Sequence, residues 1–367
     1  MQGDDAMHED EASLGEFELI DRYFGPGRPS VAGASDAARR SPGAFGTPGA
    51  AFTPGAAGAP GATRRSDVIL GIGDDAALLR CPADKDLVAA VDTLVEGRHF
   101  PAGSAPRSIG HRSLAVNLSD LAAMGATPAW ATLALTLPAA DRRWLEGFSA
   151  GFLDLAAAHG VELVGGNTTA GPLNINVQIL GHIDRGSALR RSGAQPGEVL
   201  AVTGTLGDAG AGLALVTGRA VSADRAVAAE LIERFEYPTP RVQFGMAARG
   251  IASAAMDLSD GLAGDLPKLA RASGLAAHVD VERLPLSPAL RSLAPLAQAR
   301  EWALGAGEDY ELLVAVPAQR FGDLAAAAAR LNLTLTAIGE LRRGTGVTWA
   351  LEGLPFAAPG GGYDHFR

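Results

Sequence analysis

Hydrophobic positions along this chain follow two alternating patterns, which predict helices and strands in turn. Residues 108–124 and 141–159 repeat their apolar positions at helical spacing. Gly125 and Gly160 follow them as the expected helix ends. Shorter apolar runs bounded by Gly, Pro or Asp predict strands. These runs cover residues 67–73, 87–91, 129–137, 161–164, 173–183, 199–203, 254–256 and 312–316. The alternation predicts an α/β fold.

A polar stretch rich in Gly and Pro, at residues 185–196, interrupts this alternation. We therefore expect two domains, an N-terminal one over residues 1–186 and a C-terminal one over residues 187–367. Within the first domain, the Gly-Gly-Asn-Thr-Thr sequence at 165–169 predicts a loop directly after a strand.

Residues 25–66 differ from the rest of the chain in composition. They consist mostly of Gly, Pro, Ala and Ser, with several arginines and few bulky apolar side chains. Such a segment buries too little apolar surface to offset the entropy lost on ordering, which predicts a disordered insertion. A basic tether for an acidic partner is the less favoured alternative.

The composition indicates a globular protein of the cytoplasm. Hydrophobic residues make up 47% and charged residues 20% of the 367 positions, which is enough apolar material for a sizeable core. The long uncharged stretch 121–140 is interrupted by Gly125, Pro128 and Pro138, so we expect no membrane span. The acidic N-terminus lacks the pattern of a secretory signal, and a single cysteine, Cys81, fits a reducing compartment.

The charge balance limits the classes of ligand. A formal net charge of −10 argues against nonspecific nucleic-acid binding, which needs a cationic surface. Lys85 and Lys268 are the only lysines, and neither belongs to a G-x-x-x-x-G-K-[ST] phosphate loop. A phosphate enzyme of this composition would therefore rely on metals, arginines and backbone amides.

Aspartates gather at the ends of apolar segments, where α/β proteins collect ligand groups. They are Asp74, Asp75, Asp92, Asp120, Asp257 and Asp260. Hard carboxylate oxygens suit Mg²⁺, which takes one or two carboxylates and shares its other positions with water and phosphate. A single aspartate after a strand equally often caps a helix or shapes a turn. The recurrence of such clusters in one chain favours metal binding.

Two further segments allow a functional and a structural interpretation. The acidic turn at residues 307–311 places three carboxylates before an apolar strand, so they must be solvated, paired or ligating. The glycine-rich segment 204–212 resembles a phosphate cradle. Close packing of a helix on a strand also requires glycine, and packing is the favoured interpretation.

Three other candidates give weaker signals. Arg190 and Arg191 lie in the polar boundary segment, where they either reach a nucleotide phosphate or are simply solvated. His99 is isolated, and no His/Cys spacing suggests zinc. The G-x-S-x-G sequence at 147–151 lies in a predicted helix and lacks the strand-to-helix turn of a serine nucleophile elbow.

Taken together, these segments resemble the thiamine-monophosphate kinase family, which belongs to the superfamily of aminoimidazole-ribonucleotide synthetase and selenophosphate synthetase. The matching stretches occur in order along nearly the whole chain outside the insertion. They comprise residues 15–20, 71–79, 91–100, 117–125, 165–169, 190–194, 256–262, 307–312 and 362–366. Each stretch alone is unspecific, but their combination is specific.

The resemblance implies a fold, an activity and partners. It implies two domains of the aminoimidazole-ribonucleotide synthetase type, α/β (α+β) in class, with mixed sheets flanked by helices. It also implies that ATP and Mg²⁺ are held largely by the first domain, through which a homodimer forms. The implied activity is phosphorylation of thiamine monophosphate to thiamine diphosphate.

The resemblance also implies site residues, position by position. The metal ligands it implies are Asp75, Asp92, Asp120, Asn167, Asp257 and Asp260. The nucleotide-contacting positions are Gly166, Asn167, Arg191 and Ser259. The positions that hold thiamine phosphate are His99, Glu308 and Tyr363.

Two positions depart from the family pattern. Asn167 stands where the family usually has aspartate, so this ligand offers an uncharged amide oxygen in place of a carboxylate. Val91 replaces a Ser or Thr that often precedes Asp92. The first change bears on the affinity for one metal and, more remotely, on activity.

The implied reaction agrees with the residue types. A phosphate monoester, with a second pKa of about 6, is largely ionised at neutral pH and needs no general base. Direct in-line transfer then depends on metals and positioning, with no catalytic side chain and no phosphoenzyme. The alternatives are another ATP-using synthetase of the superfamily, or a non-catalytic protein that binds thiamine phosphate or nucleotide. The acidic turn and the ending 363–366 argue against another synthetase. Product analysis distinguishes a non-catalytic binding protein from a kinase.

Overall fold

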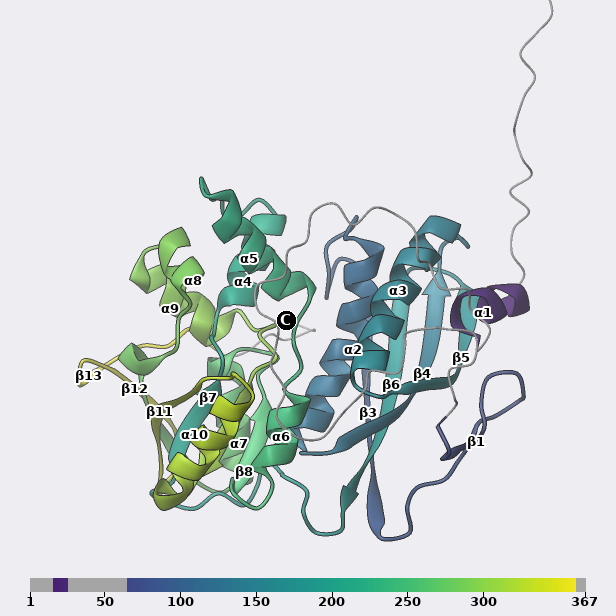
Figure 1. Ribbon diagram of the computed structural model, residues 1–367. Coiled ribbons are helices and arrows are strands. Elements are labelled where there is room, and N and C mark those ends of the chain that lie inside the picture. Colours follow the sequence, from purple (N-terminus) through teal and green to yellow (C-terminus); the bar gives the residue numbers. More distant parts are fainter. Residues whose placement is uncertain (1–15, 26–64, 361–367) are drawn as a thin grey trace, which may run out of the picture.

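The computed structural model describes residues 16–25 and 65–360, which form two lobes side by side (Figure 1). The first lobe is built on a four-stranded sheet and the second on a seven-stranded sheet. Each sheet mixes parallel and antiparallel pairs and carries helices, which confirms the expected fold class. The insertion expected at 25–66 lies, apart from its ends, outside the described residues.

Four strands form the first sheet in the order β3-β6-β4-β5. Their bounds are β3 (Lys85–Val95), β4 (Thr127–Leu137), β5 (Glu162–Ala170) and β6 (Asn174–Asp184). β4 and β5 run parallel, and the other neighbours run antiparallel. Alternate apolar side chains point to one face, because strand side chains alternate between the two faces. That face is covered by helices α2 (Pro106–Ala123) and α3 (Arg142–Ala158), while α1 (Glu16–Phe24) lies against α3 and β5.

Helices α2 and α3 approach each other closely because glycines lie at their contact. A Cβ added at Gly110 would lie 2.0 Å from the carbonyl oxygen of Phe148. A Cβ added at Gly151 would lie 1.9 Å from the carbonyl oxygen of Arg107. Ser149, the central serine of the G-x-S-x-G sequence, is fully buried inside α3. This sequence therefore serves helix packing, in agreement with its predicted helical context.

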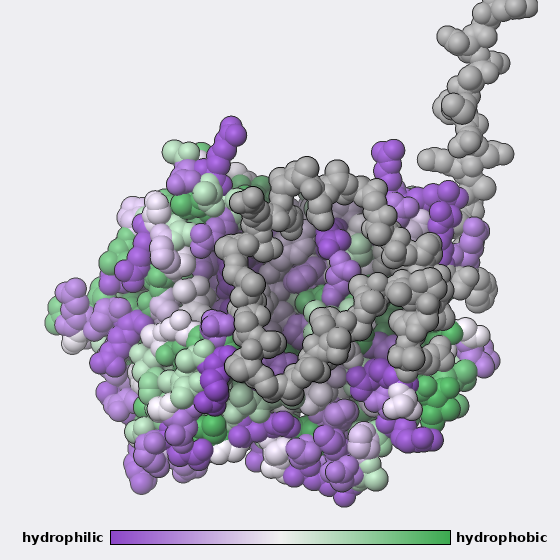
Figure 2. Space-filling model, viewed as in Figure 1, coloured by the Kyte–Doolittle hydropathy of each residue, from purple (hydrophilic) through white to green (hydrophobic). Residues whose placement is uncertain are grey.

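No helix in the described part of the chain covers the opposite face of this sheet. The hairpin of β1 (Val68–Leu70) and β2 (Leu78–Leu79) packs against Trp130 at one side of it. Exposed apolar side chains remain on β3, among them Leu87 and Val91. Hydrophobic atoms also gather at the right-hand edge of the molecule in Figure 2, where Figure 1 places β1.

Seven strands form the second sheet in the order β13-β12-β9-β11-β7-β10-β8. They are β7 (Val199–Thr203), β8 (Ala254–Asp257), β9 (Ala276–Asp280), β10 (Leu312–Val316), β11 (Leu335–Arg342), β12 (Gly346–Leu351) and β13 (Leu354–Pro355). Its helices are α4 (Asp208–Val216), α5 (Arg225–Glu236), α6 (Val242–Ala248), α7 (Leu262–Ala272), α8 (Pro288–Leu293), α9 (Leu296–Gly305) and α10 (Phe321–Arg330). Short 3-10 turns span Val281–Arg283 and Ala318–Arg320.

Strand β10 joins the two hydrophobic cores, since all its residues are buried. Leu312 and Val314 pack into the core that contains α2 and α6, whereas Leu313 packs into the core under α7 and α9. Helix α6 reaches α2 because a Cβ at Gly245 would lie only 2.0 Å from the carbonyl oxygen of Ala122. The core that contains α2 and α6 therefore includes residues of both domains.

Three secondary-structure predictions differ from the structure. Residues 165–169, expected as a loop, belong to β5, because β4 pairs with this strand in parallel as far as Ala170. Asp92, expected at the end of a strand, lies inside β3, which continues beside β6 to Val95. The strand expected over 67–73 is reduced to β1.

The connection between the two sheets runs from Asp184 to Val199. The proposed domain boundary between residues 186 and 187 falls within it and stays a prediction. The uncharged stretch 121–140 forms the end of α2 and most of β4. None of the helices that the structure describes has the length and apolar character of a membrane span.

Candidate active site

A cleft of about 510 Å³ lies where the two domains meet. Strand β3 and helix α2 form its first-domain side, and the residues after β8 and before β10 form its second-domain side. Its lining includes most of the predicted site residues: Asp92, His99, Asp120, Asp257, Ser259, Asp260 and Glu308. The fold therefore brings together side chains from both halves of the chain.

Three aspartates of the cleft interact with one another. Burial, together with the charges of Asp257 and Asp92, raises the pKa of Asp120 to about 8. Burial also raises the pKa of Asp257 to about 6, although a hydrogen bond from Ser119 opposes the rise. Burial and then the charge of Glu308 raise the pKa of Asp92. Like charges held together away from water cost free energy unless a cation joins them.

The donor set of these aspartates fits Mg²⁺. Carboxylate oxygens are its preferred protein ligands, and one or two per ion suffice when phosphate and water fill the remaining positions. Within the described ranges, no three carboxylate, His or Cys side chains are arranged to hold a metal by themselves. Phosphate oxygens would then complete the coordination. Arg191 lies close enough to lower the pKa of both Asp120 and Asp257, so it balances part of their charge.

Asp260 is held by a small network beside the cleft. Lys268 on α7 donates hydrogen bonds to Asp260 Oδ2 over 2.5 Å and to Asp265 Oδ1 over 2.8 Å. The other oxygen of Asp265 accepts the backbone N–H groups of Ser259 and Asp260, over 3.0 and 2.9 Å. The buried Asp265 thus fixes the loop that carries Ser259 and Asp260 into the cleft.

The acidic turn at residues 307–311 divides its carboxylates between the cleft and the interior. Glu308 lines the cleft. Asp309 is buried and accepts hydrogen bonds from the backbone N–H groups of Gly207 and Ala209 at the start of α4. Asp309 therefore caps a helix, and burial raises the pKa of its carboxyl to about 7.

Glu311, the third acid of the turn, is fully buried and paired. Arg234 donates to it over 2.9 Å, Arg241 over 2.6 Å, and the hydroxyl of Thr203 over 2.7 Å. A solvated turn is therefore the wrong interpretation for Asp309 and Glu311. Two of the three acids stabilise the fold, and one remains for the site.

The backbone of this turn is unusual. Glu308 and Tyr310 have positive φ angles of 67° and 49°, a conformation that non-glycine residues adopt rarely and that recurs at functional sites. Gly307 allows the turn to approach the neighbouring loop, because a Cβ there would lie 2.4 Å from the carbonyl oxygen of Ser259. The same oxygen accepts the Glu308 N–H over 2.9 Å. Glu308 and Ser259 are therefore fixed relative to each other.

The glycine-rich segment 204–212 serves packing. A Cβ at Gly210 would lie 2.2 Å from the Cβ of Ala306, and one at Gly212 would lie 2.1 Å from the carbonyl oxygen of Leu231. Asp309 already binds N–H groups at the start of α4. The favoured packing interpretation of this segment is confirmed.

Two arginines that line the cleft, Arg98 and Arg112, were not among the predicted site residues. Arg112 is buried on α2 and pairs with Glu308. The sequence does contain a signal for Arg112. It precedes Asp120 by eight residues, a spacing that places both side chains near one side of a helix. His99 also lines the cleft, and its Nδ1 accepts the backbone N–H of Val95 over 3.0 Å.

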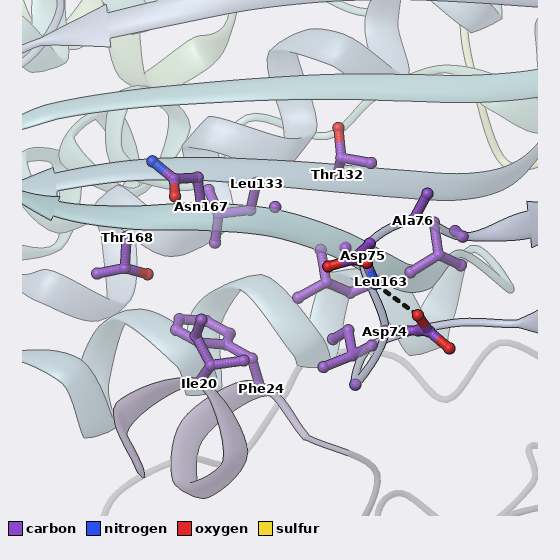
Figure 3. A pocket seen from close by; sticks show the side chains of 16 residues that line it. Ile20, Phe24, Asp74, Asp75, Ala76, Thr132, Leu133, Leu163, Asn167 and Thr168 are labelled. Atoms are coloured by element: carbon purple, nitrogen blue, oxygen red, sulfur yellow. Dashed lines mark hydrogen bonds between the residues drawn. The ribbon is translucent and has the colours of Figure 1, made fainter. Parts of the chain in front are cut away.

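Asp75 and Asn167 lie elsewhere. They line a second cavity, of about 920 Å³, at the β5 edge of the first sheet. In Figure 3, Ile20 and Phe24 project from α1 toward this cavity, and Asn167 lies on the strand opposite. Asp74 accepts the backbone N–H of Asp75 over 2.8 Å. The predicted metal ligands thus fall into two groups, near opposite edges of the four-stranded sheet.

The remaining predicted residues are placed as follows. Gly166 lines the second cavity, and it must lack a side chain because a Cβ there would lie 1.9 Å from the carbonyl oxygen of Leu133. Arg191 is exposed beside the aspartates of the first cleft. Tyr363 lies outside the described residues.

Family models match both halves of the chain. The N-terminal domain model of AIR synthase related protein matches residues 73–183, and the C-terminal domain model matches residues 195–350. Thiamine-monophosphate kinase of Salmonella typhimurium is 48% identical over 355 residues, which cover 96% of this chain and 99% of the relative. The chain belongs to the thiamine-monophosphate kinase family. The family member from Bacillus subtilis is 36% identical over 313 residues, which cover 82% of this chain and 95% of the relative.

Solved structures of thiamine-monophosphate kinases share this fold. The one from Stenotrophomonas maltophilia K279a matches with a TM-score of 0.75 and 47% identity, over 80% of this chain and 93% of that one. A structure of AaThiL complexed with AMPPCP and TMP matches with a TM-score of 0.69 and 33% identity, over 78% of this chain and 89% of that one. These matches do not favour the alternatives, another superfamily synthetase or a non-catalytic binding protein.

Proposed function

We propose that this chain transfers a phosphoryl group from ATP to thiamine monophosphate and forms thiamine diphosphate. The observation that carries the proposal is the cleft between the domains, where Asp92, Asp120 and Asp257 lie together and Glu308 lines the same space. Membership of the family supports the same reaction, because its relatives are thiamine-monophosphate kinases. The AaThiL complex with AMPPCP and TMP supports the same pair of substrates.

The proposed reaction depends on the positioning of the two substrates more than on a general base. The acceptor phosphate is itself an anionic nucleophile at neutral pH, so we infer direct in-line transfer without a phosphoenzyme. Mg²⁺ would supply the positive charge that allows two anionic substrates to approach each other. The residues that would hold it are Asp75, Asp92, Asp120, Asn167, Asp257 and Asp260. The chain would orient the substrates in the cleft between the domains.

The other site residues divide between the two substrates. We assign His99, Glu308 and Tyr363 to the acceptor, and the first two line the cleft with the aspartates. The nucleotide is assigned to Gly166, Asn167, Arg191 and Ser259. A reducing, cytoplasmic location without nucleic-acid or membrane partners is part of the proposal, and the single cysteine and the net charge of −10 support it.

A homodimer explains why the candidate ligands form two groups. Asp75 and Asn167 lie near β5 and Asp92 lies on β3, so the width of a four-stranded sheet, about 14 Å, separates them. We propose that the exposed sheet face with Leu87 packs against the same face of a second copy. A two-fold arrangement would bring the β5 edge of one copy toward the β3 edge of the other.

Introducing a charged side chain into the exposed face of the first sheet tests whether this dimer forms. Leu87→Lys should give a monomer in sedimentation and lose activity, because Leu87 is 55% exposed on the proposed interface. Leu296→Lys is the matched control, since Leu296 is 47% exposed on α9 of the other domain. A Leu87→Lys protein that stays dimeric would contradict the proposed interface.

Product analysis tests the reaction itself. The chain is incubated with ATP, Mg²⁺ and thiamine monophosphate, and thiamine diphosphate and ADP are separated by chromatography. Equal amounts of the two products are expected. Retention of thiamine monophosphate without any thiamine diphosphate would show a binding protein instead of an enzyme.

A further inference from the structure

We propose that Arg112 positions Glu308 for the acceptor, so that the pair recognises the nitrogen-rich ring system of a cationic heteroaromatic phosphate. The inference rests on the proposed function, in which Glu308 is assigned to the acceptor. Arg112 is buried beside Glu308 and acts through it, so it is a positioning residue.

Arg112 is held on several sides. Its side chain is only 3% exposed, and it donates hydrogen bonds to the carbonyl oxygen of Phe235 near the end of α5 and to Oε2 of Glu308. Its guanidinium lies over the Phe235 ring, 4.4 Å from the centroid, and 5.9 Å from the centroid of the Tyr310 ring. A planar guanidinium with two acceptors and two aromatic neighbours has little freedom to turn. It therefore fixes the direction of the Glu308 carboxylate.

Glu308 needs such a partner because of its backbone and its neighbours. Its φ of 67° places it in the left-handed region, where nothing in the local chain favours a glutamate. Its side chain remains 23% exposed at the cleft. Its carboxylate lines the same cleft as that of Asp92, so the two like charges repel each other. Arg112 opposes this repulsion, and by binding Oε2 it leaves Oε1 to accept a hydrogen bond from a ligand.

The ion pair also changes what Glu308 can bind. A bare carboxylate in this cleft would add to the charge of Asp92, Asp120 and Asp257, and a cation such as Mg²⁺ would compete with the acceptor for it. Paired with Arg112, Glu308 adds almost no net charge, yet it still offers an acceptor oxygen to an amine or a cationic ring. The pair thereby separates the carboxylate that recognises the acceptor from the carboxylates that hold metal.

The test compares the two substrates in Arg112 variants. Arg112→Met should raise the KM for thiamine monophosphate by about ten-fold or more, while the KM for ATP stays within about two-fold. Arg112→Lys should recover part of the loss, because it restores the charge but not the planar geometry. In a Glu308→Gln background, Arg112→Met should raise the KM for thiamine monophosphate by less than a further factor of about two, because both changes remove the same interaction.

A second, half-buried arginine provides the matched control. Arg241→Met removes an ion pair with Glu311 outside the cleft lining and should lower the melting temperature without a selective change in the acceptor KM. If Arg112→Met does not fold, the doubly neutral Arg112→Met/Glu308→Gln protein replaces it. That protein should show the acceptor defect of Glu308→Gln alone.

Binding measurements separate this inference from the proposed reaction. Calorimetry is performed with thiamine monophosphate and, separately, with a non-hydrolysable ATP analogue. Arg112→Met should lose affinity for thiamine monophosphate only. A parent chain that binds thiamine monophosphate but forms no product would overturn the proposed reaction, and the calorimetric comparison would still decide the role of Arg112. Equal losses of affinity for both ligands would overturn the positioning role of Arg112. Fully additive effects of Arg112→Met and Glu308→Gln on the acceptor KM would overturn it as well. A parent chain that does not bind thiamine monophosphate would overturn both.

Discussion

The hydroxyl of Ser119 donates a hydrogen bond of 3.0 Å to Oδ2 of Asp257, and the two residues belong to different domains. Ser119 lies on α2 of the first domain, and Asp257 ends β8 of the second. The bond favours the ionised carboxylate and lowers its pKa, whereas burial raises the pKa and prevails. A helix of one domain therefore tunes the charge of a candidate metal ligand in the other.

Ser119→Ala is expected to move the acidic limb of the pH–activity profile to higher pH. Without the hydroxyl, Asp257 keeps its proton to a higher pH, and a protonated carboxyl is a poor ligand for Mg²⁺. The profile is measured at a Mg²⁺ concentration below saturation. Ser113→Ala is the control, because the buried hydroxyl of Ser113 bonds to Gly110 within the same helix. Coincident profiles for the two variants would contradict the role of this bond.

Asp120→Asn should stabilise the metal-free chain at high pH. The folded-state pKa of Asp120 is raised to about 8, against about 3.9 in an unfolded chain, so the folded state binds the proton more tightly. Its contribution to stability is then fully present below about pH 4 and is lost as the pH rises toward 8. The free energy of unfolding is measured with urea in EDTA at pH 5 and at pH 8. It should fall less between these two pH values in Asp120→Asn than in the parent chain. The exposed Asp84→Asn serves as control and should behave like the parent.

Asp92→Ala and Asp260→Ala should each lower turnover by roughly a hundred-fold or more and leave the fold intact. Both carboxylates line the cleft, and phosphoryl transfer depends on positioned charge. Steady-state rates are compared with those of Asp86→Ala, an exposed aspartate on the same strand as Asp92. Turnover within a few-fold of the parent would show that Asp92 and Asp260 are structural.

Asn167→Asp should lower the Mg²⁺ concentration that gives half-maximal rate, with little change in the maximal rate. A carboxylate neutralises part of the charge of the cation, whereas the amide offers only a dipole. The added charge also repels the triphosphate, but bound metal offsets that repulsion at high Mg²⁺. Mg²⁺ titrations of both proteins at fixed substrates measure the midpoint. An unchanged midpoint would mean that the side chain of residue 167 does not touch metal.

The helices were predictable from the sequence because their signals are local. The spacing of apolar residues and the glycines at 125 and 160 place α2 and α3 to within about two residues. The register of β5 was not predictable in this way, because Gly165 and Gly166 suggest a loop and only the neighbouring β4 makes them part of a strand. Tertiary pairing overrides local preference at such positions.

The site was predictable in its chemistry but not in its arrangement. Aspartates such as Asp92 and Asp257 stand out in the sequence, and the cleft contains both. Their distance from Asp75 depends on the strand order, which no local pattern encodes. Arg112 was missed because arginines usually lie on surfaces, whereas this one is buried by its pairing with Glu308.

The turn at residues 307–311 has a practical consequence for protein engineering. Asp309 and Glu311 satisfy buried donors, so their replacement leaves polar groups without partners and endangers expression of the folded protein. Glu308 alone among the three acids lines the cleft. A library that randomises the whole turn would consist mostly of misfolded variants. One confined to Glu308 would instead explore new acceptors while the buried contacts of Asp309 and Glu311 are kept.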